Sequence, residues 1–576
     1  MSLIQIPTKV MLEGKGALTL RPNDYVTQGG EGAIYRKDKH IIKLYLDPTK
    51  MVKDGMSEKV RLLAKSFAHP SIVAPKGVVH DEHGMPLGYY MPYVSGVAYP
   101  KLFTNDGRAE VGFTDESARQ LAFSMRAVIT EAHHQGALLV DGNELNWLAD
   151  ITNPKLPVPY AIDVDSWQIG RFKAAVIMPS IRDWHSATIT STTDWFAWGI
   201  VTFLLFTGIH PYKGTLAGYK PGELERRMRD NASIFNPGVR LNKTVRDLSC
   251  IPAPLLDWYQ ATFAQGLRTI PPSPLELGKG PSVAGRILRM VTSGTGGLVY
   301  EKIFEANSAI VSIWPCGLMR TKHGDLFDYE HKRQVGVTTA AQMAAVKSGQ
   351  GWLMAEQIGS EWQFRYLSGN GQSVPLSTLL NVETVFRSDN RLFAVTDCEL
   401  VELAIQQFGK PILIPQRRWS IMGNATSWYR GVGIADLLGS IHLILPSGTD
   451  GITQVKVPEL SGVRVIGAVG HGRYVEVMTV TQNGNYEALQ FMFTHDLKSY
   501  RLTTETRDDA EQNLVILPKG VVAQITKDGE LSILVPQTGE QKLVTDTDIA
   551  TTMRLGHQGD RVIYRHENTV WSLRMR

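Results

Sequence analysis

RVIYRHENTVWSLRMR (561–576) contains two short apolar runs separated by polar residues, and it guides the interpretation of the whole C-terminal half. Runs of this length that end at turn-forming residues are typical of β-strands. Similar runs recur upstream, at AIVSIWP (309–315), RLFAVTD (391–397), SIHLILP (440–446) and RYVEVMTV (473–480). The sequence therefore predicts an all-β domain over residues 286–576.

The length of this domain bears on its arrangement. A single β-sandwich has about 100 residues, whereas the region from 286 to 576 is far longer. Blades of about 40 residues would give a β-propeller of about six or seven blades. Two stacked β-sandwiches are the alternative. A propeller would close by pairing TVWSLRMR (569–576) with GGLVYEKIF (296–304).

The N-terminal half has a different texture. Short strand-like runs come first, and long helical patterns follow up to about Leu277. IPPSPLELGKGPS (270–282) is rich in proline and glycine, as domain linkers are. We therefore predict a multidomain chain with an α+β domain over 1–278, a linker over 279–285 and then the all-β domain.

Composition argues against several classes of protein. The 60 basic and 56 acidic side chains leave a net charge of +4, which does not indicate a nucleic-acid partner. Three distant cysteines without a CxxC pair predict neither disulfides nor a zinc site and favour a reducing cytoplasm. The most apolar run, Trp195 to Phe206, is too short to span a bilayer and predicts a buried helix. We expect a soluble cytoplasmic protein without membrane insertion.

A first candidate site is TQGGEGAIYR (27–36), followed by HIIKLYL (40–46). Glycines in a turn between two strands let the backbone approach phosphates closely, because no Cβ intervenes. Lys43 lies within an apolar run, where an ammonium group has reason to be if it meets anions. The alternative is an ordinary turn followed by a lysine that faces water.

Two further runs carry oxygen ligands after short apolar strands. They are LLVDGNELNWLA (138–149) and YAIDVDSWQIG (160–170). Phosphoryl transfer needs oxygen ligands for magnesium and a carboxylate that orients the attacking hydroxyl. Each Asp or Asn taken alone is more simply a turn former. Their order after the glycine-rich turn and Lys43 nevertheless indicates a phosphotransfer site.

This order of motifs resembles the protein kinase superfamily, in particular a bacterial Ser/Thr kinase-like group. TTDWFAWGIVTFLLFTGIHPYKG (192–214) and LLDWYQATFAQGLRTIPP (255–272) extend the resemblance over most of residues 20–278. It implies a bilobal α+β kinase-like fold with lobes at about 20–96 and about 97–278. It also implies ATP and Mg²⁺ as cofactors.

The resemblance implies a role for each matching residue. The nucleotide would be held by Gly29, Gly30 and Gly32 over the phosphates, by Lys43 paired with Glu58, and by Met91 and Tyr93 at the adenine hinge. The catalytic loop would carry Asp141, which orients the acceptor hydroxyl, together with Asn143. Magnesium would be held by Asn146 and by Asp163, Asp165 or both. Asp194 would tie its helix to the catalytic loop.

Several positions depart from the family pattern. Leu139 and Val140 replace the usual His-Arg, so we expect no switch by a phosphorylated loop. Asn143 replaces the usual lysine, and Ser180 replaces a glutamate. The leading hypothesis is an ATP- and magnesium-dependent Ser/Thr protein kinase whose all-β domain recruits a protein substrate or partner. The alternatives are a nucleotide-binding pseudokinase scaffold and an enzyme that transfers AMP.

Overall fold

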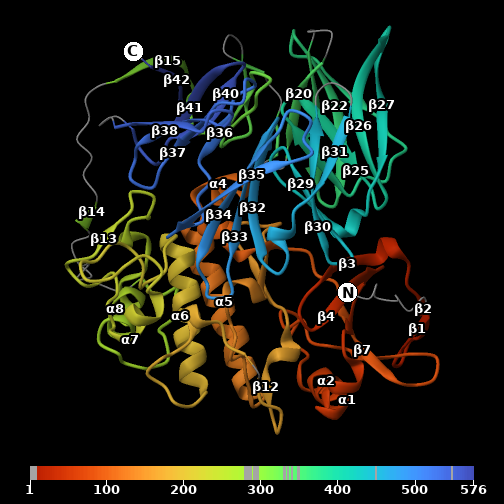
Figure 1. Ribbon diagram of the computed structural model, residues 1–576, viewed down its shortest axis with the longest axis vertical. Helices are drawn as coiled ribbons and strands as arrows, with labels where there is room; N and C mark the ends of the chain where they lie inside the picture. The colour runs from red at the N-terminus through yellow and green to blue at the C-terminus, as the bar shows by residue number, and fades with distance from the viewer. Residues whose placement is uncertain are drawn as a thin grey trace.

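The computed structural model describes residues 9–174, 176–277, 288–289, 297–328, 332–333, 336–338, 341–346, 351–447, 451–545 and 549–575. The predicted linker, 279–285, lies outside these residues. Figure 1 shows the N-terminal sheet and the helices in its lower half and the strand-rich C-terminal region above them. The chain is mostly strand, with few helices and an all-β C-terminal region, as the strand pattern predicted.

The N-terminal half begins with a seven-stranded antiparallel sheet in the order β2-β1-β6-β7-β5-β4-β3. Its strands are β1 (Lys9–Leu12), β2 (Gly16–Thr19), β3 (Tyr25–Gln28), β4 (Gly32–Lys37), β5 (His40–Tyr45), β6 (Gly77–His80) and β7 (Pro86–Pro92). β4 belongs to the glycine-rich run of the sequence analysis, and β5 belongs to the run that contains Lys43. The site residues of this sheet are therefore placed by its register.

The helices of the described N-terminal half follow this sheet or lie between its strands. They are α1 (Pro48–Lys53), α2 (Met56–Ser66), α3 (Tyr99–Phe103), α4 (Asn105–Val111), α5 (Asp115–His134), α6 (Ser191–Thr207), α7 (Leu224–Arg229) and α8 (Ala253–Phe263). α1 and α2 are separate helices. Gly55 adopts a left-handed φ of 73° between α1 and α2 and breaks the run.

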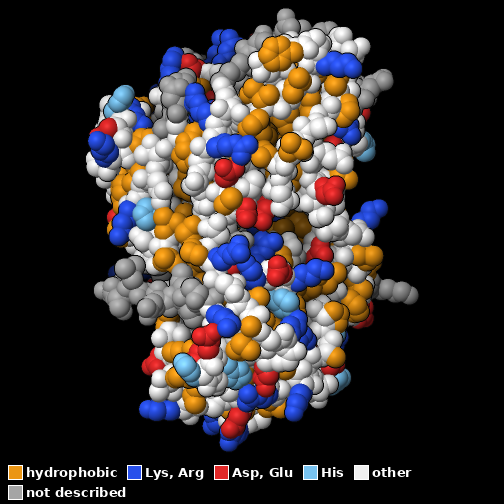
Figure 2. Space-filling view, turned by 90° about the vertical axis from the view of Figure 1, so that its right-hand side faces the viewer, with side chains coloured by type: hydrophobic (Ala, Val, Ile, Leu, Met, Phe, Trp, Pro, Cys, Tyr) orange, Lys and Arg blue, Asp and Glu red, His pale blue; other side chains and the backbone are white. Residues whose placement is uncertain are grey.

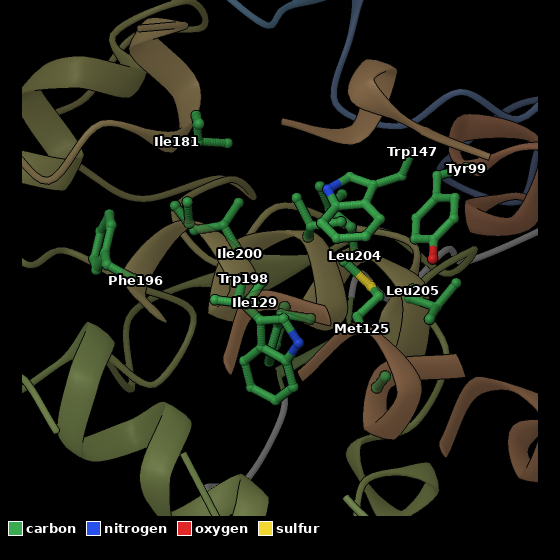
Figure 3. Close-up of a cluster of buried hydrophobic side chains, with 14 of the residues drawn as sticks. Tyr99, Met125, Ile129, Trp147, Ile181, Phe196, Trp198, Ile200, Leu204 and Leu205 are labelled. Atoms are coloured by element: carbon green, nitrogen blue, oxygen red, sulfur yellow. The ribbon is translucent and has the colours of Figure 1, made fainter. Parts of the chain in front are cut away.

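α6 is the centre of the main hydrophobic core. Every side chain from Asp194 to Thr207 is buried, which confirms the buried helix predicted from its sequence. Figure 3 shows α6 side chains such as Trp198 and Leu204 among Met125 and Ile129 of α5 and Trp147. A helix that is apolar on all sides belongs in the interior. Among the described residues, no helix is long and apolar enough to cross a membrane.

Gly199 provides a test of how tightly α6 is packed. A Cβ at this position would meet Trp258 Cζ3 at 2.9 Å and Phe263 Cζ at 3.2 Å. Alanine favours a helix by about 1 kcal/mol over glycine, but overpacking costs about 1–3 kcal/mol. We expect Gly199→Ala to lower the melting temperature of the N-terminal half, measured by calorimetry; an increase would show that Trp258 can move aside.

The rest of the N-terminal half consists of loops with short strands between them. They are β8 (Val97–Ala98), β9 (Ala137–Leu138), β10 (Trp147–Asp150), β11 (Val158–Ala161), β12 (Gln168–Ile169) and β13 (Arg240–Leu241), which pairs in parallel with β14 (Leu288–Arg289). β9 pairs with β12, and β10 pairs with β11 and β8. These pairings fix the chain on both sides of residues 141–146 and 162–166.

The described C-terminal region forms seven four-stranded antiparallel sheets. Six consist of consecutive strands: β16 (Ile310–Ile313), β17 (Met319–Thr321), β18 (Leu326–Phe327) and β19 (Lys332–Arg333); β20 (Gln342–Ala345), β21 (Gly351–Ile358), β22 (Glu361–Ser368) and β23 (Ser373–Leu376); β24 (Thr384–Ser388), β25 (Arg391–Val395), β26 (Glu399–Phe408) and β27 (Lys410–Ser420); β28 (Thr426–Trp428), β29 (Gly433–Leu437), β30 (Ser440–Ser447) and β31 (Gly451–Lys456); β32 (Arg464–His471), β33 (Tyr474–Val480), β34 (Tyr486–Phe493) and β35 (Tyr500–Arg507); β36 (Leu514–Ile516), β37 (Val522–Ile525), β38 (Leu531–Val535) and β39 (Glu540–Val544).

The seventh sheet joins the two ends of this region. It contains β15 (Leu298–Glu305) beside β42 (Thr569–Met575), followed by β41 (Arg561–His566) and β40 (Arg554–Gln558). Leu298 lies opposite Met575, and Glu305 lies opposite Thr569. The predicted pairing of the last strand with the first is therefore present.

Candidate functional site

The glycine-rich hairpin between β3 and β4 is closed by a hydrogen bond from the Gly29 N–H to the Gly32 carbonyl, 2.9 Å long. A Cβ at Gly32 would lie 2.8 Å from the Leu44 carbonyl oxygen, so packing requires glycine there. A Cβ at Gly29 or Gly30 would meet nothing within 4 Å. The space beside these two glycines is open, and a ligand can approach the backbone of the turn.

Lys43 extends from β5 into a group of carboxylates. Its buried Nζ lies 2.8 Å from Asp165 Oδ2, 3.4 Å from Asp163 Oδ1 and 3.8 Å from Glu31 Oε2. Burial opposes the charged ammonium, but the carboxylates, Asp165 foremost, keep the pKa of Lys43 above its ordinary value. The structure thus brings together Lys43, Asp163 and Asp165, residues up to 122 positions apart in the chain.

Asp165 is held inside this group by three hydrogen bonds. Its carboxylate accepts from Lys43 Nζ and, at 2.6 Å, from the Tyr89 hydroxyl. Its carbonyl oxygen accepts from Lys59 Nζ at 2.5 Å. Burial alone would raise the pKa of Asp165, but Lys43 and these hydrogen bonds hold it below its ordinary value. Asp165 is therefore a charged, fully engaged carboxylate.

Asp163 differs from Asp165 because its side chain is 44% exposed. Its backbone has a left-handed φ of 59°. Loss of hydration and the neighbouring Asp165 charge raise the pKa of Asp163 to about 6, while Lys43 opposes this shift. Both oxygens of Asp165 already have donors, so Asp163 is the carboxylate with room for a metal ion.

The raised pKa of Asp163 predicts how stability depends on pH. The folded protein binds a proton here more tightly than the unfolded chain, so this group's stabilising contribution is complete below about pH 4 and is lost as pH rises through about 6. Above pH 6 we expect the free energy of unfolding of Asp163→Asn to exceed that of the wild type by about 1 kcal/mol. The difference is this small because Asp163 is partly exposed and water screens its charge. Thermal denaturation of both proteins across this range measures the difference, and a gain that does not depend on pH would contradict it.

The loop that carries Asp141 is fixed from α6. The Asp194 carboxylate accepts the backbone N–H groups of Leu139 at 2.8 Å and Val140 at 2.9 Å. Val140 has a left-handed φ of 66°, which is unfavourable for a β-branched residue. His133 Nε2 lies 2.9 Å from the same carboxylate. The tie between Asp194 and this loop is present, as the sequence suggested.

Asn146 lies between this loop and the Asp163 segment. Its Nδ2 donates to the Asp141 carbonyl at 2.8 Å, and its own carbonyl accepts the Ile162 N–H at 3.0 Å. Its backbone is therefore adjacent to the residue that precedes Asp163. The side-chain amide of Asn146 and the carboxylate of Asp163 therefore belong to two neighbouring segments.

Both oxygens of the Asp141 carboxylate are occupied. Oδ1 accepts the Met178 N–H at 2.8 Å, and Oδ2 accepts Asn143 Nδ2 at 3.0 Å. Burial raises the pKa of Asp141 in spite of these two bonds. Asp141 and Asn143 are in contact, as expected for residues of one loop, but Asp141 faces the 178–180 segment in this conformation.

The predicted pair between Lys43 and Glu58 is wrong. Glu58 is exposed and forms an ion pair with Arg171. Glu58 comes two positions after Met56 and therefore lies on the opposite side of α2, whereas Lys59 is three positions after Met56 and faces inward. Lys59 is buried and reaches Asp165 in its place.

Met91 and Tyr93 lie on or next to β7, one strand away from Lys43. Met91 is opposite Ile41 and packs partly buried against the cluster that contains Tyr89. Tyr93 is exposed, and the Arg36 guanidinium lies 4.2 Å from its ring centre. No described contact joins Met91 or Tyr93 to Lys43 or to the carboxylates.

The oxygen ligands of this site suit magnesium better than a metal ion whose ligands all come from the protein. No group of three His, Cys, Asp or Glu side chains among the described residues is placed to hold a metal ion. Magnesium is usually bound by one or two protein oxygen ligands together with substrate phosphates and water. Asp163 and Asn146 provide such oxygens, so the residues present fit this ion.

A cavity lies elsewhere, in the all-β region. It has a volume of about 530 Å³ and is lined mainly by polar side chains of β34, β35 and β37–β39. The face in Figure 2 has basic and acidic side chains interspersed with apolar ones. The candidate site is therefore identified from its charged groups, not from the size of its cavity.

Three neighbours of the site were missed from the sequence: Lys59, Tyr89 and Glu31. A signal existed for Lys59, because its helical spacing puts it with the apolar residues Met56, Val60 and Leu63. Tyr89 lies opposite Lys43 in the sheet, and only strand register shows this. Glu31 lies within the glycine-rich turn itself.

No protein-family model matches the chain, and no curated protein matches it. The resemblance to the protein kinase superfamily is therefore contradicted, since a strand-dominated, multi-sheet chain without any family match supports no kinase lobe. The physical reason is that glycine, aspartate and asparagine in turns occur in many folds, so their order in one sequence is weak evidence of descent. What remains is the observed cluster of Lys43, Asp163 and Asp165, with Asn146 and Asp141 on the adjoining segment.

Proposed function

We propose that this cluster binds ATP with Mg²⁺ and transfers the γ-phosphate to a Ser or Thr hydroxyl of a protein. The single observation that carries the proposal is the buried Lys43 ammonium, which meets Asp163 and Asp165 beside the open glycine turn. Phosphoryl transfer depends mainly on positioned charges rather than on covalent chemistry. A cation, oxygen ligands and accessible backbone together supply such charges.

Each residue has a distinct part in this proposal. Lys43 pairs with phosphate oxygens, and the backbone at Gly29 and Gly30 covers them. Asp163 and Asn146 hold the magnesium ion, which neutralises phosphate charge when bound. Asp141 orients the acceptor hydroxyl and takes its proton, which requires the Met178 segment to move away from Oδ1.

Incubation of the full chain with magnesium and γ-labelled ATP tests the proposal. We expect label to reach the protein itself or a mixture of hydroxyl-bearing proteins, and to be lost in Lys43→Ala and Asp141→Asn. Lys76→Ala is a matched control, because Lys76 is an exposed lysine next to the same sheet. If the wild type transfers no label, or if the variants transfer it equally, the proposed activity is refuted.

The occupied Asp141 carboxylate favours a second candidate, a nucleotide-binding scaffold that does not transfer phosphate. Its two hydrogen bonds leave neither oxygen free of a donor. Binding of ATP with magnesium, detected by calorimetry in the absence of label transfer, would select this candidate. Transfer that Asp141→Asn abolishes would reject it.

We also propose that the seven sheets form the blades of a β-propeller that holds a protein substrate or partner, in the cytoplasm. The shared sheet of β15 and β42 supports a ring over two stacked sandwiches, because it joins both ends of the region. The three cysteines are free, as in a reducing compartment. Removal of 569–576 is expected to expose β15 and β41 to hydrogen exchange; unchanged protection would argue against closure.

A further inference from the structure

One carboxylate of the all-β region forms several hydrogen bonds with the strand that leads into the glycine turn. Asp436, on β29, accepts hydrogen bonds from the Tyr25 hydroxyl at 3.1 Å, the Thr27 hydroxyl at 2.8 Å and the Gln28 N–H at 3.1 Å. The Gly439 N–H, from its own sheet, donates to the same carboxylate at 2.7 Å. Asp436 is only 9% exposed, so these bonds are shielded from water. Figure 1 shows β3 next to the sheet that contains β29 and β30.

This contact is made at an edge of the N-terminal sheet. β3 is one of the two edge strands of that sheet, and among the described residues it pairs with β4 alone. The pairing is irregular between Tyr25 and Thr27, and the glycine turn begins directly after Gln28. An edge strand followed by two glycines moves easily unless other groups hold it. Asp436 holds it on the side that β4 leaves open.

Some other contacts between the two halves lie near Asp436 but form no hydrogen bond to Thr27 or Gln28, the residues that lead into the glycine turn. Asn424 Nδ2 donates to the Asn23 carbonyl at 2.8 Å, and Asn424 Oδ1 accepts from Arg36 Nη1 at 3.5 Å. Ala425 and Met422 pack against the apolar core of the N-terminal sheet. These groups attach the sheet as a whole, whereas Asp436 bonds to the two residues that lead into the turn.

We propose that Asp436 is a positioning residue that fixes the glycine-rich hairpin over the nucleotide phosphates, so that the all-β region completes the nucleotide site. This inference rests on the proposed function. An ionised carboxylate that accepts several hydrogen bonds restricts each donor more strongly than a neutral acceptor does. Holding Thr27 and Gln28 leaves the turn preorganised, which reduces the ordering required on binding.

The test compares the full-length wild type with Asp436→Ala, Thr27→Val and Asn424→Ala. Thr27→Val removes one hydrogen bond to Asp436 by changing the donor in β3, and it leaves Asp436 bonded to Gly439. Asn424→Ala weakens the same interface without removing a bond to Thr27 or Gln28. The readouts are amide hydrogen exchange of residues 27–32 without nucleotide, and calorimetric affinity for ATP with magnesium.

We expect Asp436→Ala to raise exchange in residues 27–32 and to weaken ATP binding roughly tenfold, with smaller shifts of the same kind in Thr27→Val. Asn424→Ala should change neither quantity, and exchange in α6 and β33 should stay unchanged in all variants. The inference is overturned if Asp436→Ala leaves residues 27–32 unaffected, or if Asn424→Ala has the same effect.

The two proposals fail in different ways. If the wild type binds no ATP, the proposed function is wrong, and with it the nucleotide part of this inference. The exchange comparison needs no nucleotide, so it still decides whether Asp436 holds the hairpin. If ATP binds but all variants bind it equally, the proposed function stands and the role of Asp436 is rejected.

Discussion

Replacement of Asp165 by alanine is expected to lower the free energy of unfolding of the N-terminal half by about 3 kcal/mol. Asp165 is buried, and its loss leaves Lys43 and the Tyr89 hydroxyl without their shared carboxylate, whereas Lys59 keeps its bond to the backbone carbonyl of position 165. The estimate is at the lower end for a broken buried ion pair, because Asp163 remains 3.4 Å from Lys43. Hydrogen exchange in urea, read from peptides of β5 and β7, measures the change.

Asp257→Ala is the matched control, since Asp257 is exposed on α8 and should change stability by less than about 0.5 kcal/mol. Asp165→Asn should be milder than alanine, because an amide still accepts from Tyr89. A loss below about 1 kcal/mol for Asp165→Ala would mean that Asp163 and Glu31 compensate for it.

Replacement of Glu476 by alanine is expected to destabilise the C-terminal region by about 3–5 kcal/mol. Glu476 is fully buried in β33 and pairs with Arg507 at 3.0 Å. It also accepts from Gln490 at 3.2 Å and from Gln512 at 3.3 Å. Alanine would leave a buried guanidinium with only the exposed Glu505 as a charged partner. Hydrogen exchange of β33 and β34 in urea measures the loss.

A double variant separates the ion pair from simple packing. Glu476→Met with Arg507→Met removes both charges and should recover most of the lost stability. Glu361→Ala, at an exposed position at the start of β22, is the control. If the double variant is as unstable as Glu476→Ala, then size rather than unpaired charge determines the loss.

Strands of the C-terminal region were predictable because turn residues bound them. RLFAVTD contains β25, SIHLILP contains most of β30, and RYVEVMTV contains β33. Their sheet membership was also partly predictable, since most are neighbours in sequence and pair through short turns. The exception, β15 with β42, was inferred from the need of such a region to close.

The site was predictable only as a set of residue types. Lys43, Asp163 and Asp165 were identified, but the partner of Lys43 was not, because one position along α2 separates an exposed Glu58 from a buried Lys59. Asp436 had no signal in the sequence, since 408 positions separate it from Gln28. The family resemblance was misleading for a related reason: it relied on turn residues whose spacing is shared by unrelated folds.

The pairing of β15 with β42 has a consequence for biosynthesis. β15 ends at Glu305, and its partner begins only at Thr569. A ribosome adding about 5–20 residues per second needs roughly 10–50 s to produce the intervening chain. During that time β15 has left the exit tunnel without its neighbour and presents an unpaired edge. Slow or stalled translation of the last segment would therefore expose the nascent chain to aggregation or chaperone capture, even though every preceding sheet is already complete.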